Sequence, residues 1–248
     1  MESKNTLQPN WQDIGGMFVA INREHRFGTD AVLLEDFAAA LKKDIVCEIG
    51  TGCGIIPVLM CKNGRAQKIY AVDIEPAAAE LASLAVEKNA LEKVEIICAD
   101  ANDLKYFDKK IGAGNLSLVV CNPPYYKENS GGDYKKEQRA AAREESKLDI
   151  DAVCKFASRF LKFGGRFCVC YKPERLCDLF VAMRQNGIEP KKIRFVQKEI
   201  NAAPWLCLVE GKKGAKSFLK TIPPLVMNSK EGLEEILEIY GEIKNKQE

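Results

Sequence analysis

The feature that most constrains the fold is a mostly apolar run that leads directly into a glycine-rich turn. Ile45–Ile49 has the length of a strand, and Gly50–Gly54, with glycine at every second position, follows it before a helix expected to extend to about Cys61. Glycine adopts turn conformations that other residues disfavour and lets the backbone approach a ligand closely. A strand that enters a helix through such a turn is typical of open α/β sheets, which bind ligands beyond the carboxyl ends of their strands.

The same succession of strands and helices continues along the chain. Further strands are expected at Met17–Asn22, Lys68–Asp73, Val94–Cys98, Leu116–Cys121, Arg166–Tyr171, Lys191–Gln197 and Trp205–Glu210. Further helices are expected at Ala31–Lys42 with Thr29 or Asp30 as its cap, at Pro76–Asn89, at Asp149–Lys162 ending before Gly164-Gly165, and at Pro173–Asn186. The alternation predicts a doubly wound, mostly parallel α/β sheet of the Rossmann-like type. The closeness of the last two strands predicts an antiparallel hairpin at the edge of that sheet.

The length of 248 residues favours one main domain with appendages. We expect residues 1–43 to form an N-terminal arm and a capping helix, residues 44–220 to form the main domain, and residues 221–248 to form an acidic helical tail. Residues 1–16 are polar and are expected to be loosely tied. The long polar segment Lys127–Lys147 lies inside the main domain, and its length predicts a functional role such as a lid.

Composition excludes several classes of protein. With 46% hydrophobic and 29% charged residues, the chain has an ordinary globular composition rather than a disordered one. No apolar run approaches the length of a membrane span, and the N-terminus lacks the apolar region of a signal peptide, so we expect a cytoplasmic protein without membrane contact. The chain has one histidine, His25, and no C-x-x-C pair, so no metal site is expected. Six of the ten cysteines fall in expected strands, where they behave as small apolar residues: Cys47, Cys98, Cys121, Cys168, Cys170 and Cys207.

The net charge of +2 says little about partners, but its distribution is uneven. The segment Lys191–Lys220 has only Glu199 and Glu210 as acidic residues. Its basic residues are Lys191, Lys192, Arg194, Lys198, Lys212, Lys213, Lys216 and Lys220. A cluster of this kind is either a footprint for a nucleic-acid backbone or an ordinary solvated surface. Charge alone leaves both interpretations open.

The glycine turn and two carboxylates predict a nucleoside site. The spacing is G-x-G-x-G, and Ile55 occupies the position where a dinucleotide-binding turn has its third glycine, which favours S-adenosylmethionine over NAD. Asp73 ends the second strand of the series, where a carboxylate accepts from the ribose hydroxyls of either cofactor or caps the helix that follows. Asp100 ends the third strand and is placed to accept from an adenine amino group. The candidate cofactor-binding residues of the turn are Glu48, Gly50, Gly52 and Gly54.

A second constellation, Asn122-Pro123-Pro124-Tyr125, follows the apolar strand Leu116–Cys121. Two prolines end the strand and hold the next peptides stiffly. The side-chain oxygen of Asn122 and the backbone carbonyl of Pro123 would accept both hydrogens of a planar amine, and Tyr125 would stack on the base that carries it. Alignment and fixed dipoles then do most of the catalysis without a strong base. The alternative is an ordinary strand-to-loop turn, of which Asn-Pro is a common signal.

Taken together and in this order, the motifs Glu48–Gly54, Asp73, Asp100 and Asn122–Tyr125 resemble those of class I S-adenosylmethionine-dependent methyltransferases that act on amino groups. Three further segments resemble the bacterial tRNA1(Val) (adenine(37)-N6)-methyltransferase family. They are Phe27–Leu34, Asn122–Lys127 and Ala142-Arg143-Glu144.

That resemblance implies methyl transfer from S-adenosyl-L-methionine to N6 of the adenosine beside the anticodon of a tRNA, with no stable protein partner. It places Thr29 and Asp30 near the methionine end of the cofactor, so both are candidate cofactor-binding residues. It places Arg143 and Glu144 in the loop around the target base. Asn122 then serves both the cofactor and the amine, with Pro123 and Tyr125 as the other candidate catalytic residues.

Alternative functions share parts of this pattern. The same loop suits the side-chain amide of glutamine in release factors, guanine N2 in ribosomal RNA and adenine N6 in DNA. About 44 residues precede Ile45, too few for the helical domain that usually precedes release-factor enzymes, and Tyr125 stands where ribosomal guanine enzymes often have phenylalanine. A non-catalytic RNA-binding protein is expected to have a damaged glycine turn or to lack Asn122, and an NAD-dependent dehydrogenase needs the missing third glycine. The sequence therefore predicts an RNA adenine N6-methyltransferase, with tRNA preferred.

Overall fold

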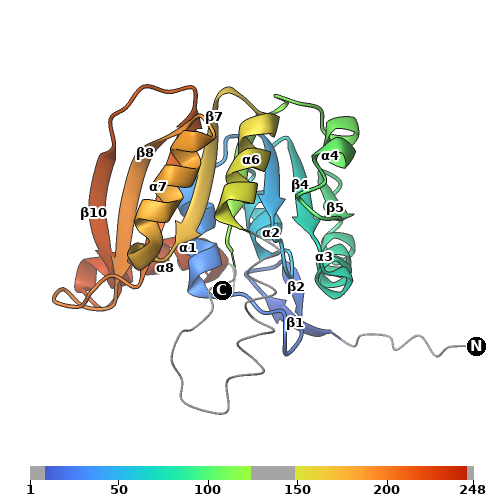
Figure 1. Ribbon diagram of the computed structural model, residues 1–248. Helices are drawn as coiled ribbons and strands as arrows, with labels where there is room; N and C mark the ends of the chain where they lie inside the picture. Colours follow the sequence, from blue (N-terminus) through green and yellow to red (C-terminus); the bar gives the residue numbers. More distant parts are fainter. Residues whose placement is uncertain (1–8, 124–148, 245–248) are drawn as a thin grey trace, which may run out of the picture.

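The computed structural model describes residues 9–123 and 149–244 (Figure 1). Its centre is an eight-stranded sheet with helices on both faces. The strands are β3 (Ile45–Ile49), β4 (Lys68–Asp73), β5 (Val94–Cys98), β6 (Leu116–Cys121), β7 (Leu161–Tyr171), β8 (Ile188–Gln197), β9 (Leu206–Lys213) and β10 (Lys220–Val226). Their order across the sheet is β10-β8-β9-β7-β6-β3-β4-β5. Only β9 runs antiparallel to its neighbours, so the mostly parallel α/β sheet is confirmed.

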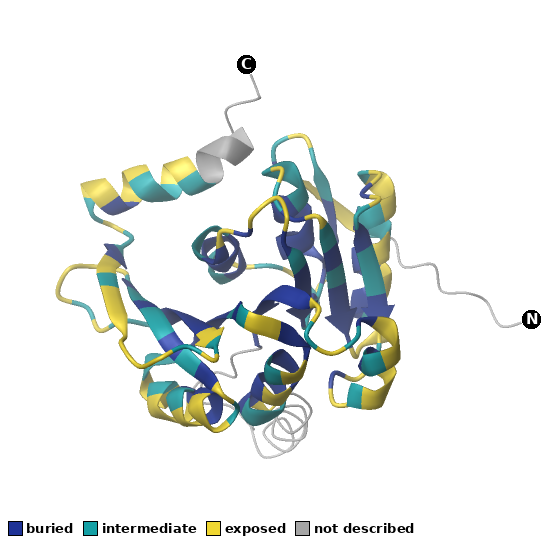
Figure 2. Ribbon diagram, turned by 90° about the horizontal axis from the view of Figure 1, so that it is seen from above, coloured by how far each residue is buried: buried dark blue, intermediate teal, exposed yellow. Residues whose placement is uncertain are grey.

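Two apolar layers, one on each face, hold the helices to the sheet. The helices are α1 (Thr29–Ala38), α2 (Ile55–Lys62), α3 (Pro76–Lys88), α4 (Leu104–Lys110), α6 (Ile150–Phe160), the short 3-10 helix η1 (Pro173–Arg175), α7 (Leu176–Gln185) and α8 (Lys230–Lys244). Residues of α1, α2 and α8 pack on one face, and residues of α4, α6 and α7 pack on the other. Because the strands alternate their side chains between the faces, both layers are continuous across the sheet. Figure 2 shows the buried residues concentrated in the sheet and on the inner sides of these helices.

The N-terminal segment is tied more firmly than expected. Strand β1 (Asn10–Asp13) pairs antiparallel with β2 (Phe18–Ile21), so the prediction of a loose arm through residue 16 is wrong for these residues. The hairpin docks on the end of α3, because the Asn89 side chain accepts from the Phe18 N–H at 2.8 Å and donates to its carbonyl at 2.7 Å.

Helix α1 begins two residues earlier and ends four residues earlier than its sequence suggests. Its N-cap is Gly28, which makes no side-chain cap, so the prediction that Thr29 or Asp30 caps the helix is wrong. The helix ends at Ala38 rather than near Lys42, and Ala39 takes a left-handed conformation with φ 41°. Arg166 of β7 donates to the carbonyls of Ala38 and Ala39 at 2.6 and 3.4 Å, which satisfies the end of the helix from across the sheet.

The far end of the sheet also differs from expectation. Strands β8 and β9 form the expected antiparallel hairpin, but β10 pairs with β8 and takes the edge position. A strand therefore crosses the expected boundary at residue 220, and the final helix begins at Lys230. Strand β7 begins at Leu161, directly after α6, so Gly164-Gly165 lies inside a strand with a register shift rather than after a helix. Within the described ranges, no helix is long and apolar enough to cross a membrane.

Candidate active site

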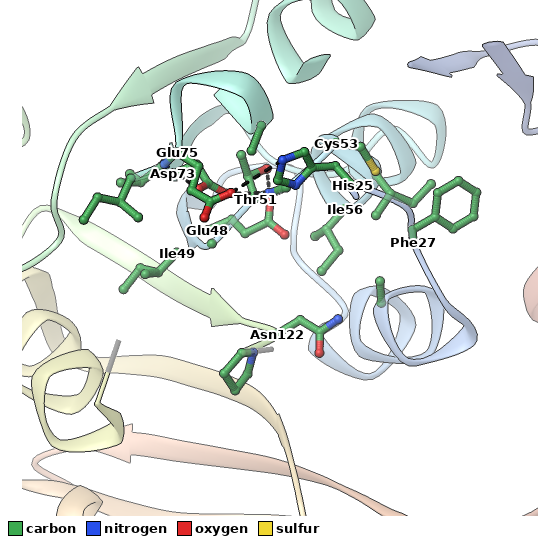
Figure 3. A pocket seen from close by; sticks show the side chains of 18 of the residues that line it. His25, Phe27, Glu48, Ile49, Thr51, Cys53, Ile56, Asp73, Glu75 and Asn122 are labelled. Atoms are coloured by element: carbon green, nitrogen blue, oxygen red, sulfur yellow. Dashed lines mark hydrogen bonds and ion pairs between the residues drawn. The ribbon is translucent and has the colours of Figure 1, made fainter. Parts of the chain in front are cut away.

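A cavity of about 690 Å³ opens at the carboxyl ends of β3, β4 and β6. Its wall combines the turn after β3, the loops after β4 and β5, the end of β6 and the loop before α1. Eight of the sequence-predicted site residues line it: Asp30, Glu48, Gly50, Gly52, Asp73, Asp100, Asn122 and Pro123. Thr29 and Gly54 do not appear in its lining, whereas Tyr125 lies outside the described residues, as do Arg143, Glu144 and the Lys127–Lys147 segment. Figure 3 shows Glu48 and Asp73 grouped on one side of the cavity and Asn122 on another.

The three glycines of the turn have different functions. Gly50, Gly52 and Gly54 all have positive φ, at 74°, 55° and 79°. A Cβ at Gly52 would have no atom within 4 Å, so its backbone is open to a ligand in the cavity. A Cβ at Gly54 would lie 3.1 Å from the Cβ and 3.2 Å from the Cα of Ala82 in α3. Gly54 is therefore a packing residue between two helices, and its predicted contact with a cofactor is not supported by this geometry.

Asp73 holds the glycine turn in place. One carboxylate oxygen accepts from the Gly52 N–H at 2.7 Å, and the other accepts from the Glu75 N–H at 3.0 Å. Neither bond caps α3, which has no side-chain cap at its N-terminus, so the alternative of a helix cap is wrong. Each carboxylate oxygen can accept a second hydrogen bond. Asp73 can therefore make these two contacts and still accept from the ribose hydroxyls, as the sequence predicts.

Glu48 is a buried carboxyl at the floor of the cavity. It is 2% exposed and accepts a 2.5 Å hydrogen bond from the Thr51 hydroxyl. Burial raises its pKa to about 8 against the lowering effect of the Thr51 hydrogen bond, and the neighbouring Asp73 raises the pKa further. Near neutral pH the carboxyl therefore holds its proton until a cation comes close.

Asn122 lies at the end of β6, where the strand enters the cavity wall. Its amide nitrogen donates to Oδ2 of Asp30 at 3.1 Å, across 92 residues of sequence. The orientation of the Asn122 amide follows from this bond, because a carboxylate can accept but not donate. Figure 3 shows the nitrogen end of the amide turned toward the segment that leads into α1. The contact joins the segments Phe27–Leu34 and Asn122–Lys127, which the family resemblance gives as separate motifs, through Asp30 and Asn122.

Sequence reasoning missed a contact at the mouth of the cavity. Nε2 of His25, in the loop before α1, lies 3.5 Å from Oε2 of Glu75, in the loop after β4. Both residues line the cavity, so the pair links two of its walls (Figure 3). Glu75 stands two residues after Asp73, but the sequence offers no signal that pairs it with His25. Asp100 also lines the cavity, and its Oδ1 accepts from the backbone and the side chain of Asn102 at 2.8 and 2.9 Å.

The basic segment lies away from this site. Because β9 runs antiparallel, Lys212 pairs with Arg166 and Lys213 pairs with Ile188, near the starts of β7 and β8. These lysines therefore sit at the amino edge of the sheet, opposite Asn122. Two other basic residues of the segment form ion pairs, Lys192 with Glu210 and Arg194 with Glu235. The geometry favours the ordinary-surface interpretation for the lysines of β9 over a nucleic-acid footprint beside the active site.

The donor and acceptor set fits a nucleoside joined to a charged amino acid. Gly52 gives close backbone approach, and Asp73 offers acceptors at the end of β4, where a ribose is expected. Asp100 lies one strand further along, where an adenine ring is expected. Glu48 supplies a buried carboxyl for the positive charge of a methionine tail, whereas the half-buried carboxyl of Asp30 accepts from the Asn122 amide. Ile55 occupies the position where a pyrophosphate-binding turn has its third glycine, so the turn does not fit a dinucleotide.

Comparison with known protein sequences identifies the family of this chain. Residues 22–172, more than half of the chain, match the family model described as the methyltransferase small domain. A tRNA1(Val) (adenine(37)-N6)-methyltransferase from Flavobacteriaceae bacterium (strain 3519-10) is 32% identical over 184 residues, which are 68% of this chain and 74% of the relative. A protein with the same name from Porphyromonas gingivalis (strain ATCC BAA-308 / W83) is 31% identical, over 62% of this chain and 61% of the relative.

Solved structures agree on the fold. A predicted O-methyltransferase from Agrobacterium tumefaciens has a TM-score of 0.67 at 16% identity, over 85% of this chain and 96% of that one. TYW2 from M. jannaschii, solved in complex with AdoMet, has a TM-score of 0.58 at 14% identity, over 82% of this chain and 85% of that one. At such identities the likeness establishes the fold alone, and the sequence relatives establish the family. The chain belongs to the methyltransferase small domain family, in the group of tRNA1(Val) (adenine(37)-N6)-methyltransferases.

Proposed function

We propose that this protein transfers the methyl group of S-adenosyl-L-methionine to N6 of an adenine in tRNA. The observation that carries the proposal is the anchored amide of Asn122, which donates to Asp30 at the edge of a cavity that fits a nucleoside. The relatives named as tRNA1(Val) (adenine(37)-N6)-methyltransferases support adenosine 37 of a valine tRNA as the target. Such a substrate belongs to the cytoplasm, which agrees with the localisation expected from the sequence.

The cofactor would lie along the carboxyl ends of β3, β4 and β5. The Gly50–Gly52 backbone would face its amino-acid part, Asp73 would accept from the ribose hydroxyls, and Asp100 would accept from the adenine amino group. S-adenosyl-L-methionine supplies an activated methyl group on a positively charged sulfur. The carboxyl of Glu48 would favour the positive end of the cofactor.

The target amine would be held at the end of β6. The Asn122 side-chain oxygen and the Pro123 carbonyl would accept its two hydrogens, which turns the nitrogen lone pair toward the methyl group. Transfer forms a carbon–nitrogen bond as the carbon–sulfur bond breaks, the electron pair of that bond stays on sulfur, and the nitrogen then loses one proton to water. Fixed acceptors stabilise the charge that develops on the nitrogen. Tyr125 is proposed to stack on the base.

The test is methyl transfer to nucleic acid of defined composition. The purified protein is incubated with labelled cofactor and total tRNA from a strain that lacks N6-methyladenosine in tRNA, and the nucleosides are then identified by mass spectrometry. Label in N6-methyladenosine from a single tRNA is the expected result. Parallel reactions with ribosomal RNA, duplex DNA and release factors cover the alternatives, and label confined to any of these would refute the proposal.

A further inference from the structure

The amide of Asn122 has two ends with opposite functions. Its NH2 group donates and its oxygen accepts, so only one of its two orientations presents an acceptor to an amine. The strand that leads to Asn122 fixes the position of the side chain but does not distinguish the two orientations. Asp30 does, because its Oδ2 lies 3.1 Å from the amide nitrogen and a carboxylate bonds only the donating end.

Asp30 is itself held in place by three features of its surroundings. It lies in the first turn of α1, where the helix N-terminus favours a negative charge. Its backbone carbonyl accepts from the Cys170 thiol of β7 at 3.5 Å. Its second carboxylate oxygen lies over Gly28, where an added Cβ would be only 2.5 Å from Oδ1. Gly28 has an ordinary φ of −115°, so the space for Asp30, rather than the backbone conformation, requires glycine there.

We infer that Asp30 is a positioning residue for methyl transfer, which fixes the Asn122 amide with its nitrogen end on Asp30 and its oxygen end directed toward the target amine. The inference rests on the proposed function and gives Asp30 a role different from the cofactor contact that the resemblance implies. If Asp30 positions Asn122, its loss lowers kcat and leaves cofactor affinity nearly unchanged. If Asp30 only binds the cofactor, its loss raises the dissociation constant of the cofactor instead.

The first experiment removes the bond in two ways. Asp30→Ala is expected to lower kcat about 10- to 100-fold, the effect of one hydrogen bond to a charged group. Gly28→Ala keeps the carboxylate but displaces it, and because the displaced atom is the end of a side chain, the fold should tolerate it while kcat falls in the same way. The matched control is Asp36→Asn, which removes a negative charge from the same helix at a residue that pairs with Arg65 rather than with Asn122. A cofactor dissociation constant, measured by calorimetry for each variant, is expected to stay within about threefold of the wild-type value.

The second experiment exchanges donor and acceptor. Asn122→Asp places two carboxyls in contact, which raises the pKa of the pair so that one shared proton replaces the amide hydrogen at low pH. Its activity is therefore expected to fall as the pH rises and that proton is lost. The double variant Asn122→Asp with Asp30→Asn restores a donor at position 30, and its activity is expected to be higher and nearly independent of pH between 6 and 9. Equal pH profiles for the single and double variants would overturn the inference.

A third readout does not depend on the substrate. The side-chain amide protons of Asn122, followed by NMR in the presence of S-adenosylhomocysteine, are expected to shift in Asp30→Ala and to stay unchanged in Asp36→Asn. Unchanged Asn122 resonances in Asp30→Ala would refute the positioning role even if tRNA is methylated. Absence of any transfer by the wild-type protein, with the expected shift present, would instead refute the proposed function and leave the Asp30–Asn122 bond established.

Discussion

Gly52 and Gly54 lie two residues apart in one motif, yet the structure predicts different main consequences for replacing them with alanine. Both have positive φ, which costs a residue with a Cβ about 1–2 kcal/mol. At Gly54 the new Cβ also meets the Cβ and the backbone Cα of Ala82 at 3.1 and 3.2 Å, and neither atom is the end of a flexible side chain. Overpacking of this kind adds about 1–3 kcal/mol.

The expected destabilisation is therefore about 2–5 kcal/mol for Gly54→Ala and about 1–2 kcal/mol for Gly52→Ala. For a chain of this size the first value corresponds to a fall in Tm of roughly 4–20 °C and the second to roughly 2–8 °C. Cofactor affinity follows the reverse order, because Gly52 lines the cavity and Gly54 does not. Gly52→Ala is expected to weaken cofactor binding at least about tenfold, which corresponds to the loss of one close contact of about 1.4 kcal/mol.

The assay pairs thermal unfolding with calorimetric titration of S-adenosylhomocysteine at a temperature where both variants are folded. Similar Tm values for the two variants, within about 2 °C, would refute the packing role of Gly54, since that difference is under the effect of about 1 kcal/mol. Wild-type affinity in Gly52→Ala would refute close approach of the cofactor to this turn.

Three other predictions concern charged residues of the site and the surface. Because both Asp73 oxygens accept backbone N–H groups, Asp73→Ala should weaken cofactor binding and also lower Tm, and unchanged affinity in titrations would count against its ribose role. The raised pKa of Glu48, about 8, predicts that binding of a cationic cofactor releases a proton; affinity should rise with pH up to about 8 and level off above it, and Glu48→Gln should remove this component in calorimetry with buffers of different ionisation enthalpy. Lys198 follows the carboxyl end of β8, whereas Lys212 and Lys216 lie at the opposite edge of the sheet. Charge reversal of Lys198 should therefore weaken tRNA binding, and reduce its salt dependence, more than reversal of Lys212 and Lys216. Filter binding over a salt series measures both effects, and the reverse order would contradict the prediction.

The central strands and the glycine turn were predictable because their signals are local. An apolar run such as Leu116–Cys121 is buried on both faces of a parallel sheet wherever it lies in the sheet, so composition alone identifies it. The edge strand β10 gave no such signal, since it is mostly exposed and contains Pro223 and Pro224. Proline is tolerated in edge strands, and here it coincides with a register shift between Ile222 and Leu225.

Most of the residues that line the cavity were predictable from sequence motifs, but their contacts were not. Asn122 and Asp30 each carried a motif, yet their hydrogen bond joins positions 92 residues apart and depends on where α1 docks. The same holds for His25 and Glu75, which meet only because two loops face each other across the cavity. Charge counts left the role of the lysines of β9 open, and only the antiparallel direction of that strand places them at the edge of the sheet opposite the site.

The central claim is that Asn122 holds the N6 amine of a tRNA adenine for methyl transfer. It is tested most directly by single-turnover formation of N6-methyladenosine in purified valine tRNA, by wild-type protein and by Asn122→Ala, with cofactor affinity measured in parallel. We expect wild-type protein to form N6-methyladenosine. Asn122→Ala is expected to be at least about 100-fold slower, because it lacks one fixed acceptor for the transition state, and to keep the cofactor dissociation constant of the wild-type protein. A variant that still methylates at close to the wild-type rate, or a wild-type protein that leaves this adenine unmodified, would contradict the account.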